Sequence, residues 1–410
     1  MPNKALSREI EIRDYEAGKY FEFLEGFFSS DALDEKLQKL EREVSQEQGA
    51  YLRYWVIPKS AFWLGIKEGR RFLKEKMPFA RALAGTNMEL PVEFAAKFMK
   101  LTDSMPKQRI DDFKQRILGA DSVFPILFEI DIASHFWQIG YEIEWSQHAQ
   151  TSGIKVPEFT EVSSENAVEV ECKAKTPDAG RRVRKKSFYR LVDTIVEPLS
   201  SKGFNGLIEI TVPDKLPIDK NIQDQITDAI FSNLQNSVIA LAGGIQISLE
   251  LKGPGKVLAS VSEVESKIQA IRKPHSHLAA FGFMDQSTLT NPIILCVNSE
   301  SNDRFLTDIF ESLREANHQF SQKRPSLICC FVPEIKDFKG LADASALKDM
   351  TALFFDKHAK ECVFAVSYIS DAINDEIGIY ISKSMPSITF YNPKYNKALG
   401  NMASIYSAGA

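Results

Sequence analysis

Residues 167–175 read Ala-Val-Glu-Val-Glu-Cys-Lys-Ala-Lys, and this stretch decides how the rest of the chain is interpreted. Apolar residues at positions 168, 170 and 172 alternate with charged residues at 169, 171 and 173. This period of two predicts a β-strand with one apolar face and one charged face. Glu171 and Lys173 therefore point the same way, about 7 Å apart along the strand. A carboxylate beside an ammonium group at the end of a buried strand suits the binding of a divalent cation and a water molecule.

The composition is that of an ordinary globular protein with two or three domains. The chain has 410 residues, of which 44% are hydrophobic and 26% charged. A net charge of −5 argues against a surface that coats nucleic acid throughout, but it permits a local basic groove. The five cysteines form no Cys-x-x-Cys pair, which argues against a zinc ribbon and predicts buried free thiols. With no apolar signal core and no run of transmembrane length, we expect a cytoplasmic protein without membrane contact.

The apolar pattern divides the chain into three expected regions. Residues 1–120 have helical spacing and predict a helical N-terminal module. Residues 121–252 read in the order α-β-β-β-α-β-α-β, whose first six elements are a helix at 124–140, strands at 141–145, 158–162 and 167–173, a basic helix at 181–199 and a strand at 206–212. Residues 253–410 predict a further α/β region, either a separate domain or an extension of the central sheet. Later strands are expected at 245–251, 293–298, 327–332, 362–368 and 378–381, and later helices at 222–241, 303–320 and 342–358.

Four charged residues from three of these elements are candidate catalytic residues. Hydrolysis of a phosphodiester requires charge neutralisation, a deprotonated water and a stabilised leaving group, all of which Mg²⁺ held by carboxylates can supply. Glu158 and Glu171 would ligate the metal directly, and the backbone carbonyl of Cys172 would add a third oxygen. Lys173 would contact the attacking water and the scissile phosphate. Glu129 lies in an apolar helix, where a buried charge requires a partner, and it would reach the metal directly or through water.

This set resembles the PD-(D/E)xK nuclease superfamily, whose core is the restriction-endonuclease-like fold. The matching features are Glu129 in the helix before the sheet, Pro157-Glu158 at the second strand, Glu171-Cys172-Lys173 on the third, and the order of the elements over about residues 122–251. The resemblance implies an α/β fold, dependence on Mg²⁺ with Mn²⁺ as an alternative, and a nucleic-acid substrate, DNA rather than RNA. In that superfamily the second carboxylate is usually Asp, whereas this chain has Glu158.

The Glu-x-Lys spacing occurs four times, beginning at Glu171, Glu250, Glu265 and Glu334. Glu250 ends a strand-like stretch, but it lacks an upstream Pro-Glu strand and Gly-Pro-Gly follows it. Glu265 lies in a helical pattern, and Glu334 has no carboxylate partner nearby in the sequence. Only Glu171 has carboxylates from neighbouring elements. The alternative for this pair is an ordinary ion pair on an edge strand.

A concentrated run of basic residues follows the third strand. Its members are Lys175, Arg181, Arg182, Arg184, Lys185, Lys186 and Arg190, and residues 181–190 contain no acid. Such a run suits neutralisation of a phosphate backbone, which is independent of sequence and sensitive to salt. We expect it to bind nucleic acid beside the catalytic residues. The alternative is a solvated helix end.

The leading interpretation is a metal-dependent endonuclease that hydrolyses DNA in restriction, anti-phage defence or repair. The flanking regions would recognise the target, form a homodimer or gate activity. A second interpretation is a catalytically silent nuclease-fold protein that binds nucleic acid or acts as a scaffold, and the Glu at position 158 supports it. A third is an RNA-directed nuclease with the same site. No RNA-specific module such as an RNP motif occurs in the sequence to separate RNA from DNA.

Overall fold

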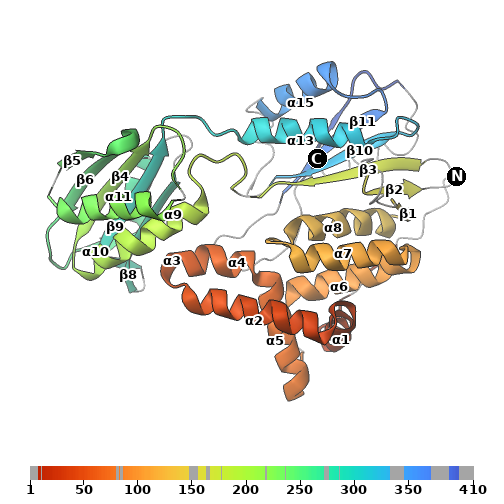
Figure 1. Ribbon diagram of the computed structural model, residues 1–410, viewed down its shortest axis with the longest axis horizontal. Helices are drawn as coiled ribbons and strands as arrows, with labels where there is room; N and C mark the ends of the chain where they lie inside the picture. The colour runs from red at the N-terminus through yellow and green to blue at the C-terminus, as the bar shows by residue number, and fades with distance from the viewer. Residues whose placement is uncertain are drawn as a thin grey trace. The chain divides into compact units, whose positions relative to one another are not determined.

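A computed structural model gives the arrangement of the chain (Figure 1). It describes residues 8–396 apart from 11, 80–82, 84–85, 147–155, 163–166, 177, 218, 236, 272–276, 286, 333–345 and 371–386. The chain forms two units. The first consists of Met1–Arg42, Lys59–Pro177 and Leu306–Ala410, and the second of Glu43–Pro58 and Asp178–Phe305.

The first unit is built on a mixed six-stranded sheet in the order β1-β2-β3-β10-β11-β12. These strands are β1 (Glu142–Trp145), β2 (Phe159–Val162), β3 (Ala167–Ala174), β10 (Ser326–Phe331), β11 (Val363–Ile369) and β12 (Ser387–Tyr391). Neighbouring strands among β1, β2 and β3 are antiparallel, β10 and β11 run parallel to β3, and β12 is antiparallel to β11. The strand expected at 167–173 is therefore confirmed, and it lies inside the sheet rather than at its edge.

Helices cover both faces of this sheet (Figure 1). On one face α8 (Phe124–Gln138) packs its Phe124 and Phe128 rings against Phe331 of β10, with ring centroids 4.4 and 5.5 Å away. On the other face lie α13 (Phe305–Gln319) and α15 (Ala346–Lys357). Thr351 of α15 and Tyr368 of β11 join their hydroxyl groups in a buried hydrogen bond of 2.8 Å. The central strands β10 and β11 are thus buried on both sides.

The N-terminal region is helical, as expected. Its helices are α1 (Ala17–Phe28), α2 (Ser30–Gln46), α3 (Gly49–Tyr51), α4 (Ile57–Lys59), α5 (Ala61–Glu75), α6 (Glu89–Leu101) and α7 (Lys107–Gly119). Their aromatic residues form a continuous core that reaches the sheet, because Phe113 of α7 contacts Phe98 of α6 at 5.6 Å and Trp145 of β1 at 5.5 Å between ring centroids. The boundary expected near residue 120 therefore does not separate two units.

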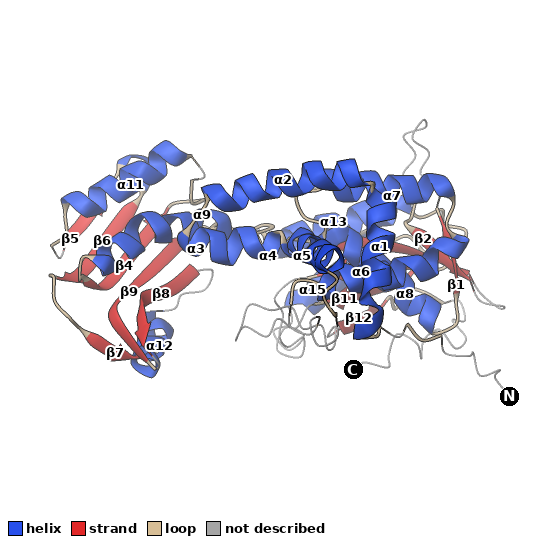
Figure 2. Cartoon of the chain, turned by 90° about the horizontal axis from the view of Figure 1, so that it is seen from below, coloured by secondary structure: helices blue, strands red, loops and turns tan. Residues whose placement is uncertain are grey.

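The second unit has its own sheet, in the order β5-β6-β4-β9-β7, with β8 also paired to β9. Its strands are β4 (Asn205–Val212), β5 (Ser237–Ala240), β6 (Gln246–Lys252), β7 (Leu258–Ser260), β8 (His277–Asp285) and β9 (Thr288–Ser299). Its helices are α9 (Lys185–Leu191), α10 (Glu197–Ser201), α11 (Lys220–Ser232) and α12 (Val261–Ile271). Helices α9 and α11 lie over one face of the sheet, and α12 lies beside β7 (Figure 2).

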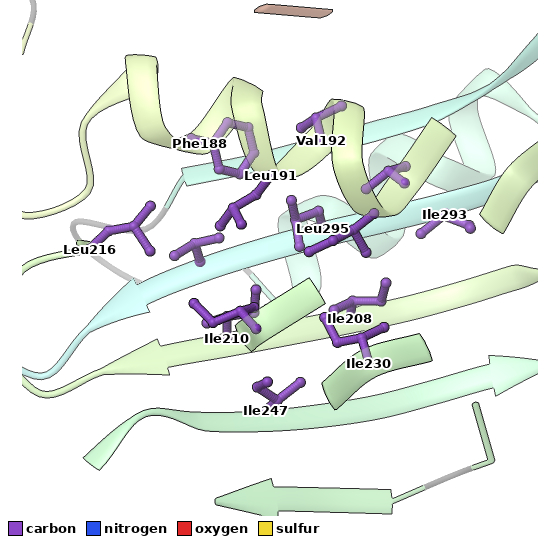
Figure 3. Packing of buried hydrophobic residues seen from close by; sticks show 14 of the residues in the cluster. Phe188, Leu191, Val192, Ile208, Ile210, Leu216, Ile230, Ile247, Ile293 and Leu295 are labelled. Atoms are coloured by element: carbon purple, nitrogen blue, oxygen red, sulfur yellow. The ribbon is translucent and has the colours of Figure 1, made fainter. Parts of the chain in front are cut away.

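The core of the second unit forms where the helices meet the sheet (Figure 3). Isoleucines at 208 and 210 alternate with less buried residues along β4, which gives the strand one fully apolar face. Phe188 and Leu191 of α9 pack onto that face, and both side chains are buried. Burial of this apolar surface stabilises the second unit independently of the first sheet.

The division into units differs from the boundaries expected at residues 121–252 and 253–410. After β3 the first sheet continues with α13 and β10, not with the helix and strand expected at 181–199 and 206–212. Asp178–Phe305, the larger part of the second unit, is therefore an insertion between β3 and α13, and the position expected as a boundary after residue 252 lies inside it, between β6 and β7. A local hydrophobic pattern identifies a strand but not the sheet to which the strand belongs.

The helix expected at 222–241 is wrong in its second half, because α11 ends at Ser232 and residues 237–240 form β5. The β-branched pair Val238 and Ile239 pairs with β6 there, and such residues favour a pleated strand. The strand expected at 378–381 lies outside the described residues. Within the described ranges, no helix has the length and apolar character needed to cross a membrane.

Candidate active site

Glu171 and Lys173 lie next to each other on β3, in the interior of the first sheet. The carboxylate of Glu171 is completely buried, and Nζ of Lys173 lies 2.7 Å from its Oε1. The two side chains share one face of the strand, as the period of two predicts. Glu169 lies on the same face, but its Oε2 accepts a hydrogen bond of 2.9 Å from the backbone N–H of Ser321. Glu169 therefore has a structural partner, and Glu171 is the carboxylate paired with the lysine.

Glu158 and Glu129 approach this pair from two other elements. Glu158 directly precedes β2, and its Oε2 accepts a hydrogen bond of 2.5 Å from Nη2 of Arg109. Glu129 lies in the middle of α8 and pairs with Arg116 through both carboxylate oxygens, with 2.9 Å between Arg116 Nη1 and Glu129 Oε2. Nη2 of Arg109 is also 3.7 Å from Glu129 Oε2. One guanidinium group therefore bridges the carboxylates of Glu129 and Glu158.

Arg109 and Arg116 are site residues that the sequence analysis missed. They lie two turns apart on α7, which places them on one face of the helix with the ring of Phe113 between them. The guanidinium carbons lie 4.5 Å and 5.5 Å from the centre of that ring. Arg109 also donates a hydrogen bond of 3.0 Å to Asp112, and only 2% of its side chain is exposed. The sequence signal for these two residues was a pair of basic side chains on either side of an apolar aromatic residue. That signal is weak, because a charged helix is usually exposed to solvent.

The negative charge of Glu158 adds to the rise in the pKa values of Glu171 and Glu129. Burial raises the pKa of Glu171 to about 8, and the negative charge of Glu158 adds to the rise, against the attraction of Lys173. Burial also raises the pKa of Glu129 to about 7, again with Glu158 adding to the rise and Arg116 opposing it. Because Glu158 acts on both groups, the three side chains lie close enough to repel each other. Such a cluster is stabilised by any cation that comes between its members.

Lys173 is protonated in this environment. Burial acts to lower its pKa, but the attraction of Glu171 and Glu158 outweighs burial, so the pKa lies above its ordinary value. About a fifth of the side chain is exposed, at 20%. The ammonium group therefore serves as a hydrogen-bond donor and a positive charge near neutral pH, not as a base.

The carboxylates of Glu129, Glu158 and Glu171 are of the chemical type that binds a hard divalent cation. Their positions in the structure, however, are not those of a metal site. Carboxylate oxygens are preferred ligands of Mg²⁺, and neither oxygen of Glu171 has a partner in hydrogen-bond geometry, since Lys173 lies near but off the hydrogen-bond direction. Glu129 and Glu158, however, are held by arginines. Among the described residues, no three His, Cys, Asp or Glu side chains are arranged to hold an ion. Cys172 lies between Glu171 and Lys173, with its backbone opposite Cys329 of β10.

The basic run is divided between the two units. Lys175 directly follows β3 in the first unit, whereas residues 181–190 belong to the second unit, and the helix there begins at Lys185 rather than near 181. The expectation that this run lies beside the catalytic residues is therefore not established. Asp178 accepts the backbone N–H of Lys185 at 2.7 Å, and this bond satisfies the first turn of α9.

Several of these basic side chains have structural partners. Arg181 Nη1 lies 2.9 Å from Asp303, and Arg182 Nη1 lies 2.6 Å from Asp214. Arg190 Nη2 lies 3.3 Å from Glu47. Arg184 and Lys186, in contrast, have no ion-pair partner within the described part of the chain. The run thus includes residues that hold the second unit together as well as residues whose charge is free for a ligand.

Comparison with known proteins gives no relative for this chain. No family model matches its sequence, and no curated protein or solved structure shows significant similarity to it. The fold and the geometry of the site are therefore the basis for proposing a function.

Proposed function

We propose that this protein is a metal-dependent nuclease, and that its first unit has the restriction-endonuclease-like fold. The observation that carries the proposal is the convergence of Glu129, Glu158 and Glu171 from α8, the start of β2 and β3, with Lys173 beside Glu171. The topology supports it, because α8, β1, β2, β3, α13 and β10 follow the order α-β-β-β-α-β once the inserted unit is set aside. DNA is the proposed substrate, and restriction, anti-phage defence or repair is the proposed setting.

Each residue would have a distinct part in phosphodiester hydrolysis. A divalent cation bound to Glu158 and Glu171 would supply charge neutralisation and a water of lowered pKa. Lys173, protonated and partly exposed, would donate a hydrogen bond to a phosphate oxygen and fix the position of the attacking water. Glu129 would complete the negative cluster from α8. The burial of these groups strengthens every electrostatic interaction made within the site.

A second candidate function is nucleic-acid binding without catalysis. The observation that favours it is the occupation of two of the three carboxylates by Arg109 and Arg116. An arginine that bridges Glu129 and Glu158 already provides the positive charge that a metal would bring. A nuclease fold that had lost its cation would need such a replacement, because unpaired buried carboxylates are costly.

Cleavage of a mixed panel of nucleic acids distinguishes the two functions. Supercoiled plasmid, linear duplex, single-stranded DNA and structured RNA are incubated with Mg²⁺, Mn²⁺ or EDTA. The nuclease predicts metal-dependent cutting that is lost in Glu171→Gln and in Lys173→Ala. The matched control is Glu250→Gln with Lys252→Ala, the same Glu-x-Lys spacing at exposed positions on β6, which should cut like wild type. Absence of cutting by the wild-type chain under every condition would support the binding function.

A further inference from the structure

Two tyrosines stack on each other at the surface of the second unit. Tyr54 lies in a π-helical turn, Leu52–Val56, and Tyr189 lies in α9. Their ring centroids are 5.2 Å apart, with 25° between the ring planes. Tyr54 remains 46% exposed although its ring is stacked on a neighbour. The pair therefore presents aromatic surface that the core of the unit does not use.

The residues just before the turn that carries Tyr54 are held against α9 and the π-helical turn that follows it, Val192–Val196. Asp193 accepts the backbone N–H of Ala50 at 2.6 Å on one carboxylate oxygen and that of Tyr51 at 3.0 Å on the other. The guanidinium carbon of Arg190 lies 4.5 Å from the centre of the Tyr51 ring. These contacts hold the turn in one position. The stacked tyrosines are therefore ordered before any ligand arrives, which reduces the entropy lost on binding.

Tyr189 is fixed from the other side. Its ring meets the edge of Phe188 at 5.5 Å between centroids, and Phe188 is buried in the core cluster shown in Figure 3. One flank of the tyrosine pair is thus attached to the core of the unit. The exposed part of Tyr54 is the part left for a ligand.

Positive charge accompanies the aromatic surface. Arg53 is exposed, with its guanidinium carbon 5.9 Å from the centre of the Tyr54 ring. Lys186 precedes Tyr189 by three residues, and side chains at that spacing are neighbours on a helix. Neither Arg53 nor Lys186 has an ion-pair partner among the described residues. The nearby acids are engaged elsewhere, since Asp178 caps α9 and Glu47 pairs with Arg190.

We propose that Tyr54, Tyr189, Arg53 and Lys186 form a binding surface for single-stranded DNA. A base stacks on the exposed ring of Tyr54, and Arg53 and Lys186 neutralise the adjacent phosphates. The strand is single because paired bases in a duplex stack on one another and expose no free ring face. This inference rests on the nucleic-acid part of the proposed function and deepens it by naming the form of the substrate. It does not involve the carboxylate site.

Binding without cleavage tests the surface. Fluorescence anisotropy of the full chain in EDTA measures the Kd for a labelled oligonucleotide as single-stranded DNA, as duplex, and as RNA of the same sequence. Tyr54→Ala removes the ring, whereas Tyr54→Phe keeps it. The matched control is Tyr15→Ala, an exposed tyrosine whose ring also lies beside an arginine, with 6.0 Å between the Arg13 guanidinium carbon and the ring centre. Thermal unfolding of each variant establishes that it is folded.

Tyr54→Ala should weaken binding of single-stranded DNA about tenfold or more, the usual effect of losing one stacked base. Tyr54→Phe and Tyr15→Ala should bind like wild type, and Lys186→Gln should reduce the slope of log Kd against log salt by about one. Equal Kd values for Tyr54→Ala and Tyr15→Ala would overturn the surface, as would tighter binding of duplex than of single strands. Tighter binding of RNA would overturn the assignment to DNA.

The same measurements separate this inference from the nuclease proposal. Metal-dependent cutting together with an unchanged Kd in Tyr54→Ala would leave the nuclease in place and remove the surface. A weakened Kd in Tyr54→Ala without any metal-dependent cutting would sustain the surface and remove the nuclease. Failure of the wild-type chain to bind any of the oligonucleotides in EDTA would overturn the surface, whereas the cleavage panel with Mg²⁺ or Mn²⁺ decides the nuclease.

Discussion

Replacing Arg109 with Gln should lower the stability of the metal-free protein substantially. The guanidinium group is 2% exposed, and its Nη2 atom lies 2.5 Å from Glu158 and 3.7 Å from Glu129. Loss of one partner from a buried ion pair leaves an uncompensated charge and costs about 3–5 kcal/mol. The side chain of Glu158 is 13% exposed, so water relieves part of this penalty. We therefore expect the free energy of unfolding to fall by about 3 kcal/mol. Urea unfolding in EDTA measures it.

The same substitution should strengthen metal binding if the carboxylates form a metal site. Arg109 holds Glu158, one of the two carboxylates that would bind the divalent cation. A doubly charged ion about 5 Å from a guanidinium is repelled by about 7 kcal/mol at an effective dielectric constant of 20. If the arginine relaxes towards Asp112 and only a fifth of that repulsion remains, replacing Arg109 lowers the Kd for the metal about tenfold. Calorimetric titration with Mn²⁺, together with the rise in Tm at saturating Mn²⁺, measures the effect.

The control for this experiment is Arg70→Gln. Arg70 also pairs with two acids, Glu25 and Asp34, but its side chain is 26% exposed and it lies on α5, away from the carboxylate cluster. It should lose little stability and leave the response to Mn²⁺ unchanged. Equal Mn²⁺-induced shifts of Tm in wild type and Arg109→Gln would refute the view that arginine and metal compete for the same carboxylates.

Three further predictions concern stability. In EDTA the unfolding free energy should fall as pH rises from about 4.5 to about 8, by up to about 1.4 kcal/mol per pH unit. The raised pKa of Glu171 means that the native state retains a proton that the unfolded chain releases, and Glu171→Gln should flatten the profile of urea midpoint against pH. Gly206→Ala should lower the urea midpoint strongly, because at φ 138° its Cβ would lie 2.0 Å from a carbonyl oxygen of β6, whereas Gly253→Ala, with open space around it, should not. Asp193→Ala should cost about 1–3 kcal/mol, and hydrogen exchange at amides 50 and 51 should accelerate, because both amides lose their acceptor.

The local part of the site was predictable from the sequence. Alternation along residues 167–173 predicts a strand and places Glu171 and Lys173 on one face, because the geometry of a strand depends only on neighbouring residues. The apolar stretch around Glu129 predicts a buried helix with a carboxylate in need of a partner. Both expectations are confirmed by the structure, and β3 lies inside the sheet rather than at its edge.

The partners of these residues were not predictable in the same way. Arg109 and Glu158 are 49 positions apart in the chain, and Arg116 and Glu129 lie on different helices. No periodicity connects such positions, since contacts of this kind are set by how helices pack. A charged helix such as α7 reads as solvated until the packing of its arginine face against α8 is known.

The sequence nevertheless contained a signal for which later strands join β3 in the first sheet. A strand with helices on both faces reads as a continuous apolar run, whereas a strand covered on one side alternates. Residues of β10 and β11 form such runs and are buried throughout. Residues of β4 and β6 alternate between buried and more exposed positions. The parallel neighbour of β3 in a sheet covered on both sides should therefore have been sought at 326–331, not at 206–212.

The ends of the inserted unit show why the first sheet tolerates the interruption. Arg304 donates its backbone N–H to the carbonyl of Gly180 at 2.8 Å, and Arg181 pairs with Asp303 beside it. Gly180 has φ +67°, and a Cβ there would lie 2.7 Å from the backbone of Phe305, so the two crossing segments require glycine at this point. The inserted chain thus leaves and returns at nearly the same place. An insertion with closed ends can fold on its own core without displacing the pairing of β3 with β10. Strand β3, which carries Glu171 and Lys173, can therefore lie far from α13 and β10 in the sequence. The three elements remain neighbours in the fold.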